Sequence, residues 1–199
     1  MKSNVCELSQ NTAELSVILE ETEKVAAYTE LDKKQTSRLR LLAEELIGMI
    51  PELLEYGSGK FWIENEGKNF SLHVSVTPSG FVDAEKRKEL LAVSTSGKNA
   101  AAVGIMNKIR IAAQLMLIDY AEVATATPTV HEFYESGMTT IPLFIDNSWS
   151  LEVYRKAMKQ KEKKEAWDEL EKSIIANIAD DVLVGIQGKQ IDIIVKKSF

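Results

Sequence analysis

The chain is poor in several residue types that other protein classes need. It has one cysteine, Cys6, with 10 glycines and 4 prolines in 199 residues. A lone cysteine forms no intramolecular disulfide and suits a reducing compartment. So little glycine and proline excludes collagen-like and low-complexity chains. Because 45% of the residues are hydrophobic and a chain of this length buries roughly 70% of its unfolded surface, we expect a folded protein that needs neither disulfide nor structural metal.

The chain also lacks long apolar runs and an excess of basic residues. Uncharged runs such as 111–118 are far shorter than the ~20 residues of a membrane span. The first residues, 1–7, contain no apolar signal-peptide region. The net charge of −6 argues against nucleic-acid or anionic-membrane binding through the overall field. We therefore expect a cytoplasmic protein that binds neither nucleic acid nor membrane.

Two helices are predicted in the first 53 residues. Residues 11–14 have capping-box spacing, and apolar residues at helical spacing follow as far as Tyr28. A second capping box at Asp32–Gln35 precedes a similar apolar stripe that runs to Ile50. Pro51 is expected to kink or end this second helix, because proline has no N–H to donate.

Two β-hairpins are predicted from alternating apolar and polar residues. One spans residues 60–76 with its turn at 65–68, and the other pairs 182–186 with 191–195 across 187–190. Helices are predicted at 83–92 and 99–122, and a charged helix, either continuous or with a break, from Asn147 or Ser148 to about Ile178. A short edge strand is expected at 139–145, where Pro142 bars a central strand. This order predicts an α+β two-layer sandwich, with helices on one face of a mixed, mostly antiparallel sheet.

Two segments carry a resemblance to a known superfamily. Residues 31–50 (LDKKQTSRLRLLAEELIGMI) resemble the N-box helix of the histidine-kinase-like (GHKL) ATPases, especially the anti-sigma-factor serine kinase branch. Residues 173–182 (SIIANIADDV) are similar to the helix and acidic turn that lead into the last two strands of the same fold. The resemblance implies a single domain of Bergerat type over 1–199, in which residues 81–165 form an enlarged, mainly helical insertion in place of the ATP lid.

The resemblance also implies a nucleotide site, and the expected boxes are altered. The N-box has Glu, three residues, then Asn; here Glu45 holds the Glu position and Met49 replaces the Asn that helps to bind Mg²⁺. A thioether is a poor ligand for Mg²⁺. Thr77 stands where the family has the Asp that accepts the adenine amino group, and residues 163–170 contain no glycine, which a phosphate box needs. We assign no cofactor, and Mg-ATP remains the alternative.

A separate anion-binding candidate is the loop Ser96-Gly97-Lys98, just before a predicted helix N-terminus. Free N–H groups, the helix dipole and a lysine favour a phosphate or an acidic group there. The alternative is an ordinary capped helix start. The ligand-binding candidates are therefore Glu45, Met49, Thr77, Ser96, Gly97 and Lys98, and Glu45 is the one catalytic candidate.

Other motifs give weaker signals. His131-Glu132 begins like a zinc-protease motif but lacks the second histidine, so we predict no metal site. The basic run 155–164 suits an acidic partner or a solvated helix face, and the acidic chain favours the latter. The three tryptophans are interpreted as core or interface anchors: Trp62, Trp149 and Trp167.

Three functions follow from these observations. The first is a non-catalytic regulatory or binding protein, anti-sigma-factor-like, that acts through a protein partner. The second is a nucleotide or phosphometabolite binder that uses Glu45 and the Ser96-Gly97-Lys98 loop, with ATPase or serine kinase activity as its catalytic form. The third is a homodimer formed through the side carrying Met158, Trp167, Leu170 and Ile174.

Overall fold

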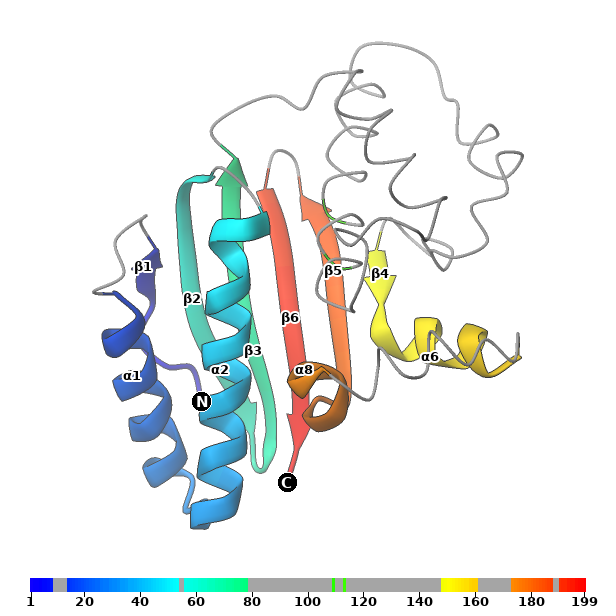
Figure 1. Ribbon diagram of the computed structural model, residues 1–199. Coiled ribbons are helices and arrows are strands. Elements are labelled where there is room, and N and C mark those ends of the chain that lie inside the picture. Colours follow the sequence, from blue (N-terminus) through cyan, green and yellow to red (C-terminus); the bar gives the residue numbers. More distant parts are fainter. Residues whose placement is uncertain are drawn as a thin grey trace.

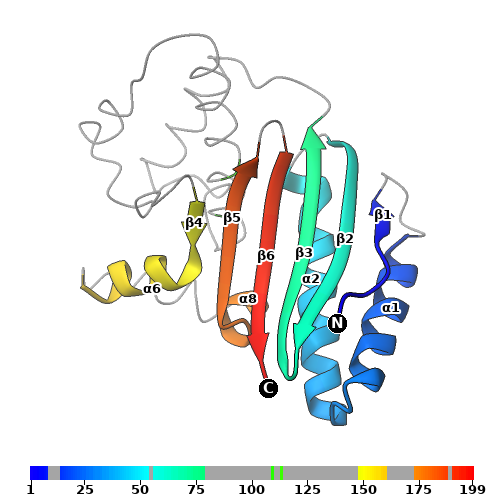
Figure 2. The same cartoon turned by 180° about the vertical axis from the view of Figure 1, so that it is seen from behind.

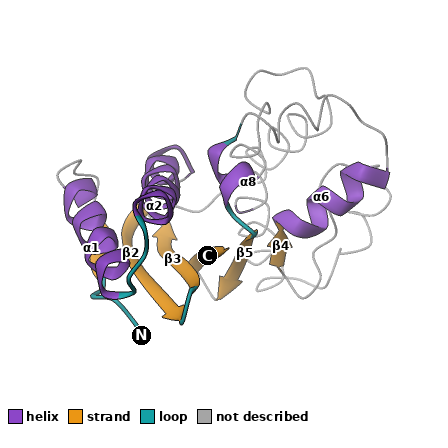
Figure 3. Ribbon diagram, turned by 90° about the horizontal axis from the view of Figure 1, so that it is seen from below, coloured by secondary structure: helices purple, strands orange, loops and turns teal. Residues whose placement is uncertain are grey.

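The fold is a two-layer α+β sandwich, as the order of elements predicts. The computed structural model describes residues 1–8, 14–53, 56–78, 109, 113, 148–160, 173–187 and 190–199. A six-stranded sheet has the order β1-β2-β3-β6-β5-β4, and α1, α2 and α8 lie on one of its faces (Figures 1 and 3). All pairings between these strands are antiparallel, so the expected mixed sheet is wrong for the described residues.

The two long helices are confirmed. Helix α1 spans Glu14–Tyr28 and α2 spans Lys33–Leu53. The second capping box forms in full, because Asp32 Oδ1 accepts from the Gln35 N–H at 2.8 Å and Gln35 Oε1 accepts from the Asp32 N–H at 3.1 Å. Helix α2 ends two residues after Pro51.

Both hairpins are also confirmed. Strand β2 (Tyr56–Glu66) pairs with β3 (Asn69–Pro78), and Gly67 at the turn has a φ of +57°. Glycine takes this left-handed conformation without the steric cost of a Cβ. Strand β5 (Asp181–Gln187) pairs with β6 (Gln190–Ser198). Strands β3 and β6 then pair with each other at the centre of the sheet, which joins the two hairpins.

The edges of the sheet differ from expectation. Strand β1 (Cys6–Leu8) pairs with β2, and β4 (Ser148–Ser150) pairs with β5. The charged helix predicted from Asn147 or Ser148 therefore starts too early: α6 begins at Leu151 and runs to Gln160, and α8 covers Ile174–Ile178. Sheet pairing by residues 148–150 outweighs their local preference for a helix start. The helices predicted at 83–92 and 99–122, the strand at 139–145 and most of the insertion 81–165 lie outside the described residues.

The main core lies between the helix layer and one face of the sheet. Strand side chains alternate between faces, and the positions facing the helices are apolar and almost fully buried. Trp149 and Tyr154 extend this core beyond β5, with ring centroids 6.1 Å apart. The helix-facing strand residues at most 2% exposed are Phe61, Ile63, Phe70, Leu72, Val74, Val76, Val182, Val184, Ile191, Ile193 and Val195.

Candidate functional site

Glu45 lies on the flank of α2 that faces away from α1. Arg40 forms an ion pair with Glu23 of α1, which fixes the α1 side of the helix. Five residues further along, Glu45 points roughly 140° away from Arg40 around the helix axis. Helix α2 lies between α1 and α8 (Figure 1) and contacts both. The Glu45 carboxylate therefore lies on the α8 side of α2, where the resemblance predicts a nucleotide site.

The electrostatics of Glu45 favour its neutral form. Its side chain is half-buried and forms no hydrogen bond or ion pair with the described residues. Burial raises the pKa of Glu45, and the neighbouring Glu44 carboxylate raises it further. Burial removes part of the hydration that stabilises the charged carboxylate, and no described cation compensates for this loss. Glu45 therefore retains its proton to a higher pH than an ordinary glutamate.

Of the two other candidates that the nucleotide-site resemblance implies, Met49 lies near Glu45 along the helix and Thr77 does not share its side of the sheet. Met49 lies one turn after Glu45 within α2. Thr77 lies on β3 opposite Ser58. Because Val76 packs into the helix-facing core, alternation directs the next residue, Thr77, to the opposite face of the strand. The described residues therefore do not bring Glu45 and Thr77 into one pocket.

The donor set around Glu45 does not fit Mg²⁺. This ion needs several oxygen ligands in nearly octahedral geometry, and in the described part of α2 the position one turn after Glu45 is a methionine. No group of three or more histidine, cysteine, aspartate or glutamate residues suited to a metal occurs among the described residues. The described residues therefore do not support a reaction that uses Mg-ATP.

Several other predicted site residues lie outside the described part of the chain. These are the Ser96-Gly97-Lys98 loop and the glycine-free segment 163–170. Of the predicted dimer side, Ile174 is the member whose side chain the structure describes, and it is 40% exposed. Both the loop and the dimer side stay predictions.

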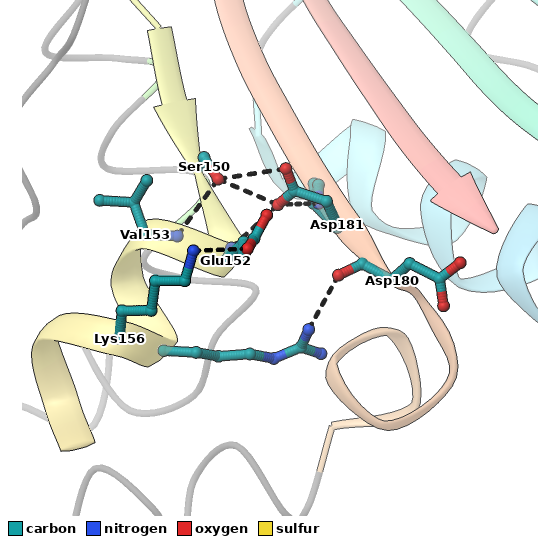
Figure 4. A network of polar contacts seen from close by, with 8 residues as sticks. Ser150, Glu152, Val153, Lys156, Asp180 and Asp181 are labelled. Atoms are coloured by element: carbon teal, nitrogen blue, oxygen red, sulfur yellow. Dashed lines mark hydrogen bonds and ion pairs between the residues drawn. The ribbon is translucent and has the colours of Figure 1, made fainter. Parts of the chain in front are cut away.

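A polar network connects α6 to the start of β5 (Figure 4). The Ser150 hydroxyl donates to Asp181 at 3.0 Å, and the same carboxylate accepts from the Glu152 N–H at 2.9 Å. The Ser150 Oγ also accepts from the Val153 N–H at 3.3 Å. Asp181 and Ser150 thus satisfy N–H groups at the first turn of α6, where an acidic group is also favoured by the helix dipole.

Arg155 reaches from α6 to the end of α8. Its guanidinium donates to the backbone oxygens of Asp180 at 3.0 Å and Ala179 at 3.3 Å, and also to that of Ala176. These carbonyls lie at and after the C-terminus of α8, where a cation is favourable. The interpretation of Arg155 as part of a solvated basic face is therefore wrong: this arginine connects two helices.

Asp180 connects the end of α8 to β6. Its carboxylate accepts from Lys197 Nζ at 2.7 Å and from the Ser198 N–H at 2.6 Å. Partial burial opposes ionisation of Asp180, but the bonds from Lys197 and Ser198 outweigh it and hold the pKa of Asp180 below its usual value. The acidic pair 180–181 therefore has two separate structural roles, one toward β6 and one toward α6.

The sequence carried a partial signal for this network. The DD pair before a strand is visible in residues 180–181, and we interpreted it as the acidic turn of the superfamily resemblance. The partners Ser150 and Arg155 lie 31 and 25 residues away from the acids that they contact. No local spacing rule links residues at such separations, so only the fold identifies the pairs.

Comparison with known proteins identifies no family for this chain. No protein-family model matches the chain, and neither a curated protein nor a solved structure does. Within the described residues, no helix has the length and apolar character that crossing a membrane requires.

Proposed function

We propose that this chain is a non-catalytic regulatory or binding protein on a histidine-kinase-like ATPase fold, acting through contacts with a protein partner as anti-sigma factors do. The observation that carries the proposal is the surroundings of Glu45: a half-buried carboxylate on α2 beside α8, with Met49 one turn away and Thr77 on the other side of β3. Among the described residues, no group of three or more histidine, cysteine, aspartate or glutamate side chains could hold a metal ion here.

The order of the elements supports the fold part of this proposal. A long capped helix, α2, leads into the hairpin β2–β3, and the short α8 leads through an acidic pair into the hairpin β5–β6. This is the order on which the superfamily resemblance rests. The two hairpins are adjacent in the sheet because β3 pairs with β6. Both segments of the resemblance, 31–50 and 173–182, therefore lead into the same sheet.

The direct test is calorimetric titration of the full chain with ATP and with ADP, each with and without Mg²⁺. We expect no heat of binding and no thermal stabilisation. A ligand present at 100 times its dissociation constant would add about 2.7 kcal/mol to the free energy of unfolding, so a negative result is informative.

If nucleotide binding is detected, two variants show whether Glu45 takes part in it. Glu45→Ala removes the half-buried carboxylate, and Glu44→Ala removes the adjacent exposed one and serves as the matched control. Nucleotide binding that Glu45→Ala weakens and Glu44→Ala preserves would contradict the non-catalytic proposal. Binding that neither variant affects would place a ligand elsewhere on the chain, and would equally contradict it.

The second candidate function is a nucleotide- or phosphometabolite-binding protein. The position of Glu45 favours it, because this half-buried carboxyl has no hydrogen-bond partner among the described residues and can accept a hydrogen bond from a ligand. In this candidate the Ser96-Gly97-Lys98 loop supplies the anion contact. Titration of a Lys98→Ala variant with inorganic phosphate and with ATP tests it: unchanged affinity for both would remove this loop from the site.

A further inference from the structure

The face of the sheet opposite the helices carries an ordered pattern of side chains. We call the side of β2, β3, β6 and β5 away from the helices the open face, because no described helix or strand lies over it (Figure 2). Strand alternation assigns side chains to it. Trp62 and Ile194 belong to the open face, since their neighbours Phe61 and Ile193 are buried under the helices.

An uncharged row crosses the centre of the open face. The register sets Trp62 opposite His73, His73 opposite Ile194, and Ile194 opposite Leu183. The rings of Trp62 and His73 are stacked, with centroids 4.8 Å apart. Burial lowers the pKa of His73, so its ring is neutral at neutral pH. Lys2 Nζ lies 4.6 Å from the centroid of the Trp62 ring, but Trp62, Ile194 and Leu183 all stay partly exposed, which leaves their remaining surface available for contact.

Four charged residues of β2 and β6 flank this row in alternating sign, with Glu7, Lys2 and Asp181 beyond them on the neighbouring segments. On one side of the row the register aligns Lys60 of β2 with Asp192 of β6, through Ser75 of β3. On the other side it aligns Glu64 of β2 with Lys196 of β6, through Ser71. On β2 the cation Lys60 and the anion Glu64 lie on opposite sides of the uncharged row, and on β6 the anion Asp192 and the cation Lys196 do the same. Across the sheet, each cation of one strand is aligned with an anion of the other. The four charges therefore form a rectangle in which like charges lie on the diagonals.

Such a rectangle is complementary to a second copy of itself. A two-fold axis in the plane of contact and parallel to β3 brings Lys60 of one copy to Asp192 of the other, and Glu64 to Lys196. An axis across the strands instead brings Lys60 to Glu64, and Asp192 to Lys196. Self-complementary contacts of this two-fold kind are the commonest in soluble oligomers, and sheets pack face to face about 10 Å apart with strands nearly aligned.

The ion pairs that Lys60 and Glu64 form within the chain do not prevent them from pairing with a second copy. Lys60 Nζ lies 3.9 Å from a Glu7 carboxylate oxygen, and Lys2 Nζ lies 3.2 Å from Glu64. The side chains of Lys60 and Glu64 are still 55% and 45% exposed. Exposed ion pairs of this kind contribute little to stability, so Lys60 can turn to a new partner on a facing sheet. Glu64 also accepts a hydrogen bond from Trp62 Nε1 at 3.0 Å, and its second carboxylate oxygen can accept from a partner on the facing sheet.

We propose that the open face binds a second copy of this chain, sheet against sheet, about a two-fold axis. The row from Trp62 to Leu183 forms the apolar centre of the contact, and the rectangle of charges sets its register. The proposal rests on strand register and charge, and it holds whether or not the chain binds a nucleotide.

The first test is sedimentation equilibrium of the full chain over a wide range of protein concentration. We expect a monomer–dimer equilibrium, and a Lys60→Glu variant with a dissociation constant about tenfold higher or more, because it places like charges opposite each other twice in each dimer. Lys34→Glu is the matched control: it makes the same charge change at an exposed position on α2 and should leave the equilibrium unchanged. Circular dichroism of each variant checks that the fold is retained.

Charge-swapped double variants give the second test and identify the axis. Lys60→Glu combined with Asp192→Lys restores the dimer if the axis runs along β3, and Lys60→Glu combined with Glu64→Lys restores it if the axis crosses the strands. Rescue by either pair supports the proposal. A wild-type chain that stays monomeric at every concentration, a dimer that Lys60→Glu does not weaken, or rescue by neither pair would overturn it.

Discussion

The two faces of the sheet come from the same strands and have opposite properties. Toward the helices, Leu72, Val74 and Ile193 are at most 1% exposed and contact other apolar groups. On the open face, the stacked Trp62 and His73 are partly exposed and the charges alternate in sign, while Ser75 is buried. The helix-covered side holds the hydrophobic core, and the open face carries the polar pattern on which the proposed dimer contact rests.

Neighbouring isoleucines on β6 give the largest expected contrast between the faces. Ile193 is fully buried under the helices, while Ile194 lies partly exposed on the open face. We expect Ile193→Ala to lower the free energy of unfolding by roughly 2–5 kcal/mol, because it removes buried methyl groups and leaves a cavity. Ile194→Ala should cost less than half as much.

Urea denaturation of both isoleucine variants, at one low protein concentration, measures this difference. The low concentration keeps association from adding to the apparent stability. Equal losses in the two variants would contradict the distinction between a covered and an open face.

Two glycines give a second contrast of intermediate size. A Cβ on Gly59 would lie 2.8 Å from Val76 Cγ1 and 3.2 Å from Leu8 Cβ, whereas a Cβ on Gly185 meets nothing within 4 Å. We expect Gly59→Ala to cost about 1–3 kcal/mol through overpacking. Gly185→Ala should be neutral or stabilising by about 0.5 kcal/mol, since alanine restricts the unfolded chain. Thermal unfolding of the two variants side by side distinguishes these outcomes, and a stabilising Gly59→Ala would show that this side of the sheet is loosely packed.

The smallest effect concerns a single proton in the helix layer. Burial and then Glu44 raise the pKa of Glu45, so the folded state binds this proton more tightly than the unfolded chain does. The free energy of unfolding therefore falls as pH rises from the ordinary carboxyl pKa to the raised one. Glu45→Gln removes this loss, and we expect a gain of about 0.5 kcal/mol or less at neutral pH, because solvent still screens a half-buried group.

The pH dependence identifies the cause of that gain. The difference between Glu45→Gln and wild type should vanish below the ordinary pKa, where both side chains are neutral. Glu44→Gln is the control, and its gain should be smaller because it removes the weaker of the two causes. Chemical denaturation across the acid range measures both variants, and a gain independent of pH would mean that charge is not its origin.

The elements predicted most accurately are those with strong local signals. The capping box at Asp32–Gln35 and the glycine in the turn at Gly67 are where the pattern indicates them. Each depends on hydrogen bonds or backbone conformation within a few residues, so the sequence alone contains the information. The start of α6 was predicted too early, because pairing of residues 148–150 with β5 is a contact with a distant segment.

The candidate site is harder to predict from the sequence than the helices and hairpins are. The chain pattern singled out Glu45, and the structure shows it half-buried on the α8 side of α2. The position of Thr77 on the other face of β3 depends on which side of that strand the helices cover. The sequence pattern does not predict the contacts of Arg155, because its acceptors are carbonyls at the end of α8, 24 and 25 residues further along the chain for Ala179 and Asp180.

The sequence by itself determined the two layers of this protein: helical stripes of period 3.6 and strands of period 2 require apolar faces that pack together. It also set which residues share a face, because alternation is a local property. Only the tertiary structure decided that the two hairpins pair through β3 and β6, and therefore that Lys60, Asp192, Glu64 and Lys196 flank one row on the open face. The β3–β6 pairing joins segments more than a hundred residues apart, and such a contact leaves no periodic trace in the chain.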